Sequence, residues 1–189
     1  MPVHFSTIMY LPANLLLMSL SELLPVVFIV LAIIGAGIQI SRERPKAGNA
    51  KMTKIFLNWA FLVIIGIGGV WGCFGHLFFA DRVAQSIGWP AGNPFQQEVA
   101  FANLAIGMLG LLALRIPGTF RIATLTAYAV FMIGDGIVHI WQIVSAGNWS
   151  VNNAGLILWI DLIMPLVLIG LYLLGEKLQM REAQPSLRR

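Results

Sequence analysis

The feature that most limits the folds open to this chain is a series of apolar runs separated by short polar stretches. Each run is about 20 residues long, the length of a helix that crosses a bilayer. Charged residues make up 11% of the chain and its mean hydropathy is +0.83, whereas an ordinary soluble domain carries about 25% charged residues. The runs lack the strict alternation over ~10 residues that is typical of membrane β-barrel strands. The sequence therefore predicts an all-α integral membrane protein.

Five spans fit these runs, and we expect four of them to form the core of one helical bundle. The predicted spans are about residues 21–40, 55–80, 95–114, 122–144 and 153–175. Residues 1–175 are therefore expected to be a single transmembrane domain. The charged residues 176–189 are expected to form a partly disordered cytoplasmic tail.

The start of the first span has two interpretations. Ser21 is a suitable N-cap, with Pro25 in the first turn, where its missing N–H costs little. Residues 1–21 would then form a short interfacial segment. Alternatively the helix begins near Pro12, and Pro25 lies inside it as a kink.

The basic residues predict an orientation, because cytoplasmic loops of membrane proteins are enriched in Lys and Arg. Eleven of the twelve fall on one predicted side of the membrane. They are Arg42, Arg44, Lys46, Lys51, Lys54, Arg115, Arg121, Lys177, Arg181, Arg188 and Arg189. We therefore expect the N-terminus outside and the C-terminus in the cytoplasm. Because these residues flank apolar spans, the expected partner is the lipid bilayer and not nucleic acid.

Two ionisable residues inside the fourth span are the strongest functional signal. Asp135 and His139 are four residues apart, so on a helix they share one face, one turn apart. Ionisable side chains at membrane depth are costly and mark functional sites by default. Such a pair can hydrogen-bond internally, fix the imidazole tautomer or bind one metal ion. The alternative interpretation is a buried pair that only holds helices together.

Further ionisable residues map to the same outer half of the membrane. With a rise of ~1.5 Å per residue, Asp161 lies roughly 12 Å below the outer start of the fifth span, and Asp135 lies at a similar depth. His76 is near the outer end of the second span, and Glu98 and Glu22 are near the starts of the third and first. These depths predict one polar pocket shared by several helices. Its candidate ligand-binding or proton-relay residues are Asp135, His139, Asp161, His76, Glu98 and Glu22.

Each of these other residues also has a purely structural interpretation. His76 would be satisfied by a backbone carbonyl, and Glu98 would cap the start of its helix, where free N–H groups favour a carboxylate. Asp161 precedes Pro165 by four residues, so the carbonyl of residue 161 lacks its usual helical donor. That carbonyl and the carboxylate resemble half of a cation or proton site, or the segment is a proline kink.

Small residues predict which faces look into the bundle. Gly69, Gly72 and Cys73 share a helical face with His76, and small residues let neighbouring helices approach closely. Asn103, with glycines four and seven residues later, predicts a tight contact for the third span, with an interhelical hydrogen bond.

A metal site, if present, would depend on histidine and carboxylate ligands. The chain has one cysteine, Cys73, so neither an internal disulfide nor a cysteine-based zinc site is expected. His76, His139 and Asp135 would supply a two-histidine, one-carboxylate arrangement for a first-row transition metal. The paired Glu-x-x-His motifs of di-iron helical bundles are absent.

Three segments carry a resemblance to a known kind of protein. They are the run from His76 through Gly110, which contains SIGWPAGNPFQQE, and the later GDGIVHIWQ and LWIDLIMP. Together they resemble a family of small multi-span bacterial and archaeal membrane proteins of unknown function. That resemblance implies a multi-pass protein of the plasma membrane, the inner membrane of the cell. The size of the chain also resembles DoxX-like four-helix membrane proteins, in architecture only.

Three functions are compatible with these residues. The first is a polar pocket that binds a metal ion or a small polar ligand. The second is proton-coupled transport of a small solute, which would require a homo-oligomer if five spans lack an inverted repeat. The third is a structural or accessory subunit whose polar residues specify helix packing. Whether the protein is an enzyme does not follow from the sequence.

Overall fold

The computed structural model describes residues 13–43 and 48–184, with side chains from residue 23 onward, and this part of the chain is helical throughout, without strands. The elements are α1 (Ala13–Glu43), α2 (Asn49–Trp59), the π-helix η3 (Ala60–Ile67), α3 (Gly68–Phe78), α4 (Ala80–Ile87), α5 (Phe95–Leu112), α6 (Thr119–Ala146), α7 (Val151–Ala154) and α8 (Leu156–Ala183). Five helical segments are long and apolar enough to cross a membrane, as predicted.

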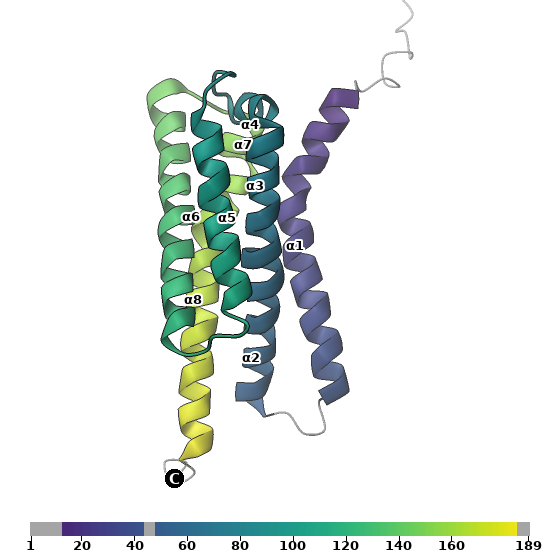
Figure 1. Ribbon diagram of the computed structural model, residues 1–189, viewed down its shortest axis with the longest axis vertical. Coiled ribbons are helices and arrows are strands. Elements are labelled where there is room, and N and C mark those ends of the chain that lie inside the picture. Colours follow the sequence, from purple (N-terminus) through teal and green to yellow (C-terminus); the bar gives the residue numbers. More distant parts are fainter. Residues whose placement is uncertain (1–12, 44–47, 185–189) are drawn as a thin grey trace, which may run out of the picture.

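Four of the five spanning segments pack together, and α1 lies on their outside (Figure 1). The continuous rod α2–η3–α3 packs along α5, while α8 packs against α2 and α6. Helix α1 touches mainly α2 and η3, and only 11% of its apolar window is buried, against 44% for the second span. Short helices α4 and α7 lie at one end of the bundle, called the cap end below (Figure 1). The end of α1, the start of α2, the α5–α6 connection and the C-terminal part of α8 lie at the other, the C-terminal end.

The cap end is held by amide side chains. Asn148 donates from Nδ2 to the carbonyl of Ile87 at 2.8 Å, and Asn152 donates from Nδ2 to Ser86 Oγ at 3.0 Å. Both bonds join the α6–α8 connection to helix α4. Because both partners come from segments about 60 residues apart in the chain, the cap is fixed by tertiary contacts and not by local turns.

Close glycine packing joins α3 and η3 to α5, as the small-residue faces predicted. A Cβ added at Gly69 would lie 2.6 Å from Gly107 Cα and 2.7 Å from the carbonyl oxygen of Asn103. One at Gly110 would lie 2.8 Å from the backbone nitrogen of Gly66. At such separations the two backbones are in direct contact, so only glycine fits at these positions. The predicted interhelical hydrogen bond of Asn103 is not found among the described residues. Its Nδ2 donates within α5 instead, to Val99 O at 3.0 Å.

The position at which α1 begins excludes one of the two interpretations of the first span. Helix α1 already begins by Ala13, so Ser21 is not its N-cap, and Pro25 lies well inside the helix. A proline within a membrane helix leaves only one carbonyl without its usual donor, and neighbouring groups satisfy it. The apolar residues before Ser21 therefore continue the helix instead of forming a separate interfacial segment. Residues 1–12 lie outside the described part of the chain.

Within the predicted tail, residues 176–183 are helical, since α8 continues to Ala183. The reason is a contact with a distant part of the sequence. The backbone N–H of Ala50, in the first turn of α2, donates to Glu182 Oε1 at 3.2 Å. Free N–H groups and the helix dipole at such a position favour a carboxylate. The last turns of α8 are therefore ordered by capping α2, and residues 185–189 lie outside the described part of the chain.

Replacing Glu182 with alanine is expected to destabilise the first turn of α2 by about 1 kcal/mol, because an N-terminal N–H loses its acceptor. The measurement is hydrogen–deuterium exchange of the Ala50 amide in the purified protein, which should become faster. Gln179→Ala is the control, because Gln179 is exposed on the same end of α8. Equal exchange at Ala50 in both variants would contradict the capping role.

Candidate functional site

A buried polar cluster lies between α6, α7 and α8. It consists of His139 on α6, Asn153 on α7 and Asp161 on α8, whose exposed fractions are 8%, 0% and 4%. Helices α6 and α8 pack side by side, and α7 directly precedes α8, so three elements bring these residues together. In a segment of this apolar character, such burial of three polar side chains requires that they satisfy one another.

The hydrogen bonds of Asn153 fix the tautomer of the imidazole. Asn153 Nδ2 donates to the carbonyl of Asn148 at 2.8 Å and to the carbonyl of His139 at 3.3 Å. Its Oδ1 lies 2.8 Å from His139 Nδ1 and is an acceptor only. Nδ1 must therefore carry the proton and donate it to Asn153. The other ring nitrogen, Nε2, is left to accept or release a proton.

His139 Nε2 faces the carboxyl group of Asp161. The distance from Nε2 to Asp161 Oδ2 is 3.7 Å, slightly longer than a direct hydrogen bond. The pair has two chemically sensible states that share one proton. Either a protonated carboxyl group faces a neutral imidazole, or a carboxylate faces an imidazolium. Removing that proton altogether leaves an unpaired carboxylate in an apolar bundle, which is costly.

Asp135 is near this pair. The sequence suggested that it could hydrogen-bond to His139, but it does not. Among the described residues no hydrogen bond joins Asp135 to His139, whose Nδ1 is occupied by Asn153. The Asp135 side chain is half-buried, and the next residue, Gly136, packs on Asp161, since a Cβ added there would lie 3.6 Å from Asp161 Cβ. Negative charges on Asp135 and Asp161 would therefore repel each other. Residues four apart on a helix share a face, but the cross-helix amide competes successfully for the imidazole.

The packing around Asp161 leaves α8 locally weak in backbone hydrogen bonds. Pro165 is buried inside α8 and has no N–H to donate to the carbonyl of Asp161. Beside it, a Cβ added at Gly136 would lie 2.6 Å from Leu162 Cδ2, so α6 and α8 approach closely here. The pair therefore sits where two helices touch and where one of them lacks a backbone bond.

His76 belongs to a different interface. Its Nδ1 lies 2.7 Å from Gln96 Oε1, and Gln96 is 2% exposed, which joins the end of α3 to the start of α5. Glu98, predicted to point into the pocket, is exposed instead. The prediction chose the wrong residue of the first turn of α5, because two residues on a helix differ by about 200° in direction. The side chain of Glu22 lies outside the described residues.

The expected metal ligands do not converge. Within residues 13–43 and 48–184, no group of three His, Cys, Asp or Glu side chains is placed to hold a metal ion. His76 is bound to Gln96 on α5, whereas His139 is bound to Asn153 on α7. Similar depth in the membrane did not imply contact, since depth says nothing about the direction in which each side chain points.

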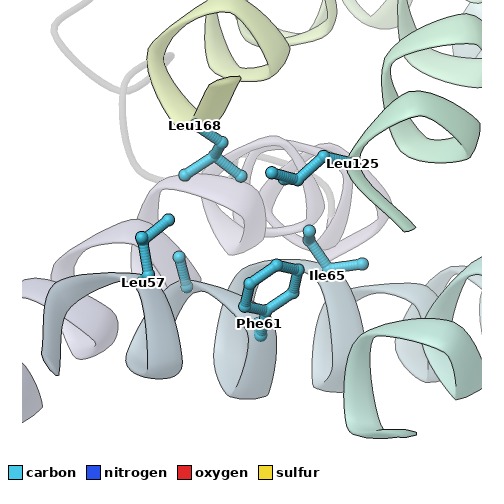
Figure 2. Close-up of a pocket in the computed structure, with 6 residues that line it drawn as sticks. Leu57, Phe61, Ile65, Leu125 and Leu168 are labelled. Carbon is cyan, nitrogen blue, oxygen red and sulfur yellow. The ribbon is translucent and has the colours of Figure 1, made fainter. Parts of the chain in front are cut away.

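A hollow beside the π-helix differs from the expected ligand pocket. Figure 2 shows side chains around it, and the lining residues are Leu57, Ala60, Phe61, Ile65, Leu125 and Leu168. All are apolar, and the space does not admit a water molecule. It also lies away from the polar cluster, because none of its lining residues is His139, Asn153 or Asp161. It is a packing defect at η3, and it gives no support to a pocket for a polar ligand.

Two amides central to these clusters were not among the predicted site residues. They are Asn153, at the predicted start of the last span, and Gln96, at the predicted start of the third. The available signal in the sequence was an amide residue at the end of an apolar span, since amides often form hydrogen bonds between helices. Without the helix pairing, neither partner could be identified.

Comparison with known proteins gives one match. The family described as "Family of unknown function (DUF6790)" matches residues 22–181, which is most of the chain. No curated protein and no solved structure matches it. The match agrees with the resemblance to a family of unknown function that the sequence suggested, and the likeness to DoxX-like proteins has no support.

Proposed function

The chain belongs to DUF6790, a family of unknown function, and we propose that it is a multi-pass membrane protein that couples proton binding to movement of a small polar solute. The observation that carries the proposal is the buried pair of His139 Nε2 and Asp161 Oδ2, 3.7 Å apart. Titratable groups that face the interior of a membrane bundle commonly form proton relays. We also propose the orientation that the basic residues indicate, with the C-terminus in the cytoplasm of the cell.

The proton chemistry follows from the fixed tautomer. Since Nδ1 of His139 donates to Asn153, the proton that moves is the one between Nε2 and the Asp161 carboxyl group. The distance of 3.7 Å must shorten by several tenths of an ångström before a direct hydrogen bond forms. Loss or gain of the proton therefore changes how strongly α6 and α8 attract each other. The nearby Asp135 raises the cost of a second negative charge.

The position of the pair supplies a way to couple protonation to movement. The pair lies at the α6–α8 contact, next to Gly136 and a few residues before Pro165. A helix that lacks one backbone hydrogen bond bends there more easily. Helices α6 and α8 touch at Gly136 and Leu162, so a solute can pass between them only if the two helices separate. Deprotonation of the pair would favour that separation.

Asp161→Asn is expected to abolish proton movement, because an amide cannot exchange a proton with His139. The measurement uses proteoliposomes with a pH-sensitive dye inside and a potassium diffusion potential, challenged with amino acids, sugars and organic cations in turn. Wild-type protein should acidify the interior with at least one solute class. Glu98→Gln is the matched control, since Glu98 is an exposed carboxylate near the same end of the bundle. Equal acidification by wild type and Asp161→Asn would contradict the proposal.

A structural role is the second candidate, and one observation favours it. Asn153 is fully buried and has all of its amide partners within the protein, as expected of a group that specifies helix packing. In that case no solute would produce acidification in the wild type. Asp161→Asn would then change only the thermal stability, and infrared difference spectra would show no carboxyl band that titrates with pH.

A further inference from the structure

A buried arginine lies near the C-terminal end of the bundle, far from the His139 cluster. Arg121, in the first turn of α6, is 8% exposed. Its Nε donates to the carbonyl of Ala113 at 3.0 Å, and its Nη2 donates to Asn58 Oδ1 at 2.7 Å. Its guanidinium also lies over the ring of Phe61, 5.4 Å from the ring centre. All of these partners are electrically neutral.

The charge of Arg121 has no counter-ion among the described residues. No carboxylate of residues 23–43 or 48–184 forms an ion pair with it, and the acid whose charge acts on it is the exposed Glu176 on α8. Buried charges in proteins are normally paired, because neutral partners offset only part of the desolvation cost. A partner that carries negative charge is therefore missing from the described contacts.

The free donors of this guanidinium reach the surface. A guanidinium has five N–H donors, and the described contacts use one on Nε and one on Nη2. The polar atoms that are both sealed from the surface and without a partner are Trp89 Nε1 and Asn152 Oδ1, in the part of the chain that is described. Nη1 of Arg121 is not among them, so it retains access to the exterior. At least one free donor of an otherwise buried guanidinium is thus accessible from outside.

The residues that Arg121 bonds have exposed cations close to them in the chain. Lys54 precedes Asn58 by four residues and lies one turn nearer the C-terminal end on the same face of α2. Arg115 follows Ala113 by two residues, and both Lys54 and Arg115 are exposed. At this end of the bundle the described residues include three acids, Glu43, Glu176 and Glu182, and seven cations, Arg42, Lys51, Lys54, Arg115, Arg121, Lys177 and Arg181. We infer that Arg121, with Lys54 and Arg115, binds the phosphate group of an anionic phospholipid at the C-terminal end of the bundle.

A lipid phosphate suits this place better than a soluble anion. Arg121 lies within three residues of the start of α6, which is long and apolar enough to cross a membrane, and the ends of such a helix lie near the phosphates of the bilayer. Arginine binds phosphate through two parallel N–H···O bonds, and the aliphatic parts of neighbouring side chains contact the acyl chains. The excess of positive charge selects lipids with a net negative headgroup over zwitterionic ones.

Native mass spectrometry of the full-length protein tests this site. The protein is released from mixed micelles that contain equal amounts of phosphatidylglycerol and phosphatidylcholine. Wild-type protein is expected to retain phosphatidylglycerol about tenfold more than phosphatidylcholine, and Arg121→Gln is expected to remove that preference. Arg82→Gln is the control, because Arg82 is an exposed arginine at the cap end and should leave the preference intact.

Two further arms keep the result decisive if Arg121→Gln fails to fold. Lys54→Gln with Arg115→Gln leaves the buried contacts of Arg121 in place and should reduce the preference several-fold. Inorganic phosphate, added to wild-type protein in detergent, should not raise the melting temperature as phosphatidylglycerol does. Absence of any lipid preference in wild-type protein would overturn the inference. Equal stabilisation by inorganic phosphate would overturn the assignment to a lipid.

Discussion

Asn153→Ala is expected to lower the stability of the bundle by about 2–4 kcal/mol, one of the two largest effects of a single substitution that the structure predicts. The side chain is fully buried, donates to the carbonyls of His139 and Asn148 and accepts from His139 Nδ1. Alanine leaves the imidazole N–H without an acceptor, and an unsatisfied buried donor costs about 1–3 kcal/mol. The small cavity left by the amide adds to this cost.

The measurement is thermal or denaturant-induced unfolding in one fixed detergent. Asn152→Ala is the matched control, from the neighbouring position of the same short helix. Asn152 makes one hydrogen bond, to Ser86, and its Oδ1 has no partner in the described structure. Its loss should therefore cost no more than about 1 kcal/mol. Equal losses of stability in the two variants would show that Asn153 does not hold the imidazole.

Gly69→Ala is expected to destabilise the protein by about 1–3 kcal/mol through overpacking. The added Cβ would lie 2.6 Å from Gly107 Cα and 2.7 Å from the carbonyl oxygen of Asn103. Both obstacles are backbone atoms, which cannot move aside as the end of a flexible side chain can. Helices α3 and α5 would have to separate along much of their contact.

The control for this substitution lies on the same helix. A Cβ added at Gly75 would meet nothing within 4 Å. Because alanine favours a helix over glycine by about 1 kcal/mol, Gly75→Ala should leave stability unchanged or raise it. Opposite signs for the two glycine substitutions, measured by unfolding in one detergent, would confirm the close approach of α3 and α5. A neutral Gly69→Ala would contradict it.

The sequence predicted well those features that depend on a single segment. The five spans and their packing faces at Gly69 and Asn103 are visible in the local pattern. It failed where a distant contact overrode that pattern. Glu182 orders the last turns of α8 by reaching Ala50, and nothing in the charged segment itself indicates a partner in α2. The π-helix at residues 60–67 lies in a uniformly apolar run, which carries no local signal for it.

The candidate site shows the same division. Asp135, His139 and Asp161 were named as candidates because an ionisable residue within an apolar span can be recognised without knowing how the helices pack. Their partners were not, and His139 pairs with Asn153 while His76 pairs with Gln96. Whether Gln96 or Glu98 faces the bundle depends on how α5 is rotated about its axis. The length and hydropathy of the span do not reveal that rotation.

The sequence by itself determined that this chain forms helices long and apolar enough to cross a membrane. In lipid an unsatisfied backbone is costly, so the helix is the only regular structure that a single apolar segment of this length can adopt. Only the tertiary structure decided which polar groups meet. Hydrogen bonds between helices act over about 3 Å, and that distance depends on the pairing and rotation of all the helices together. The depth of a residue is thus a property of its own segment, whereas its partner is a property of the whole fold.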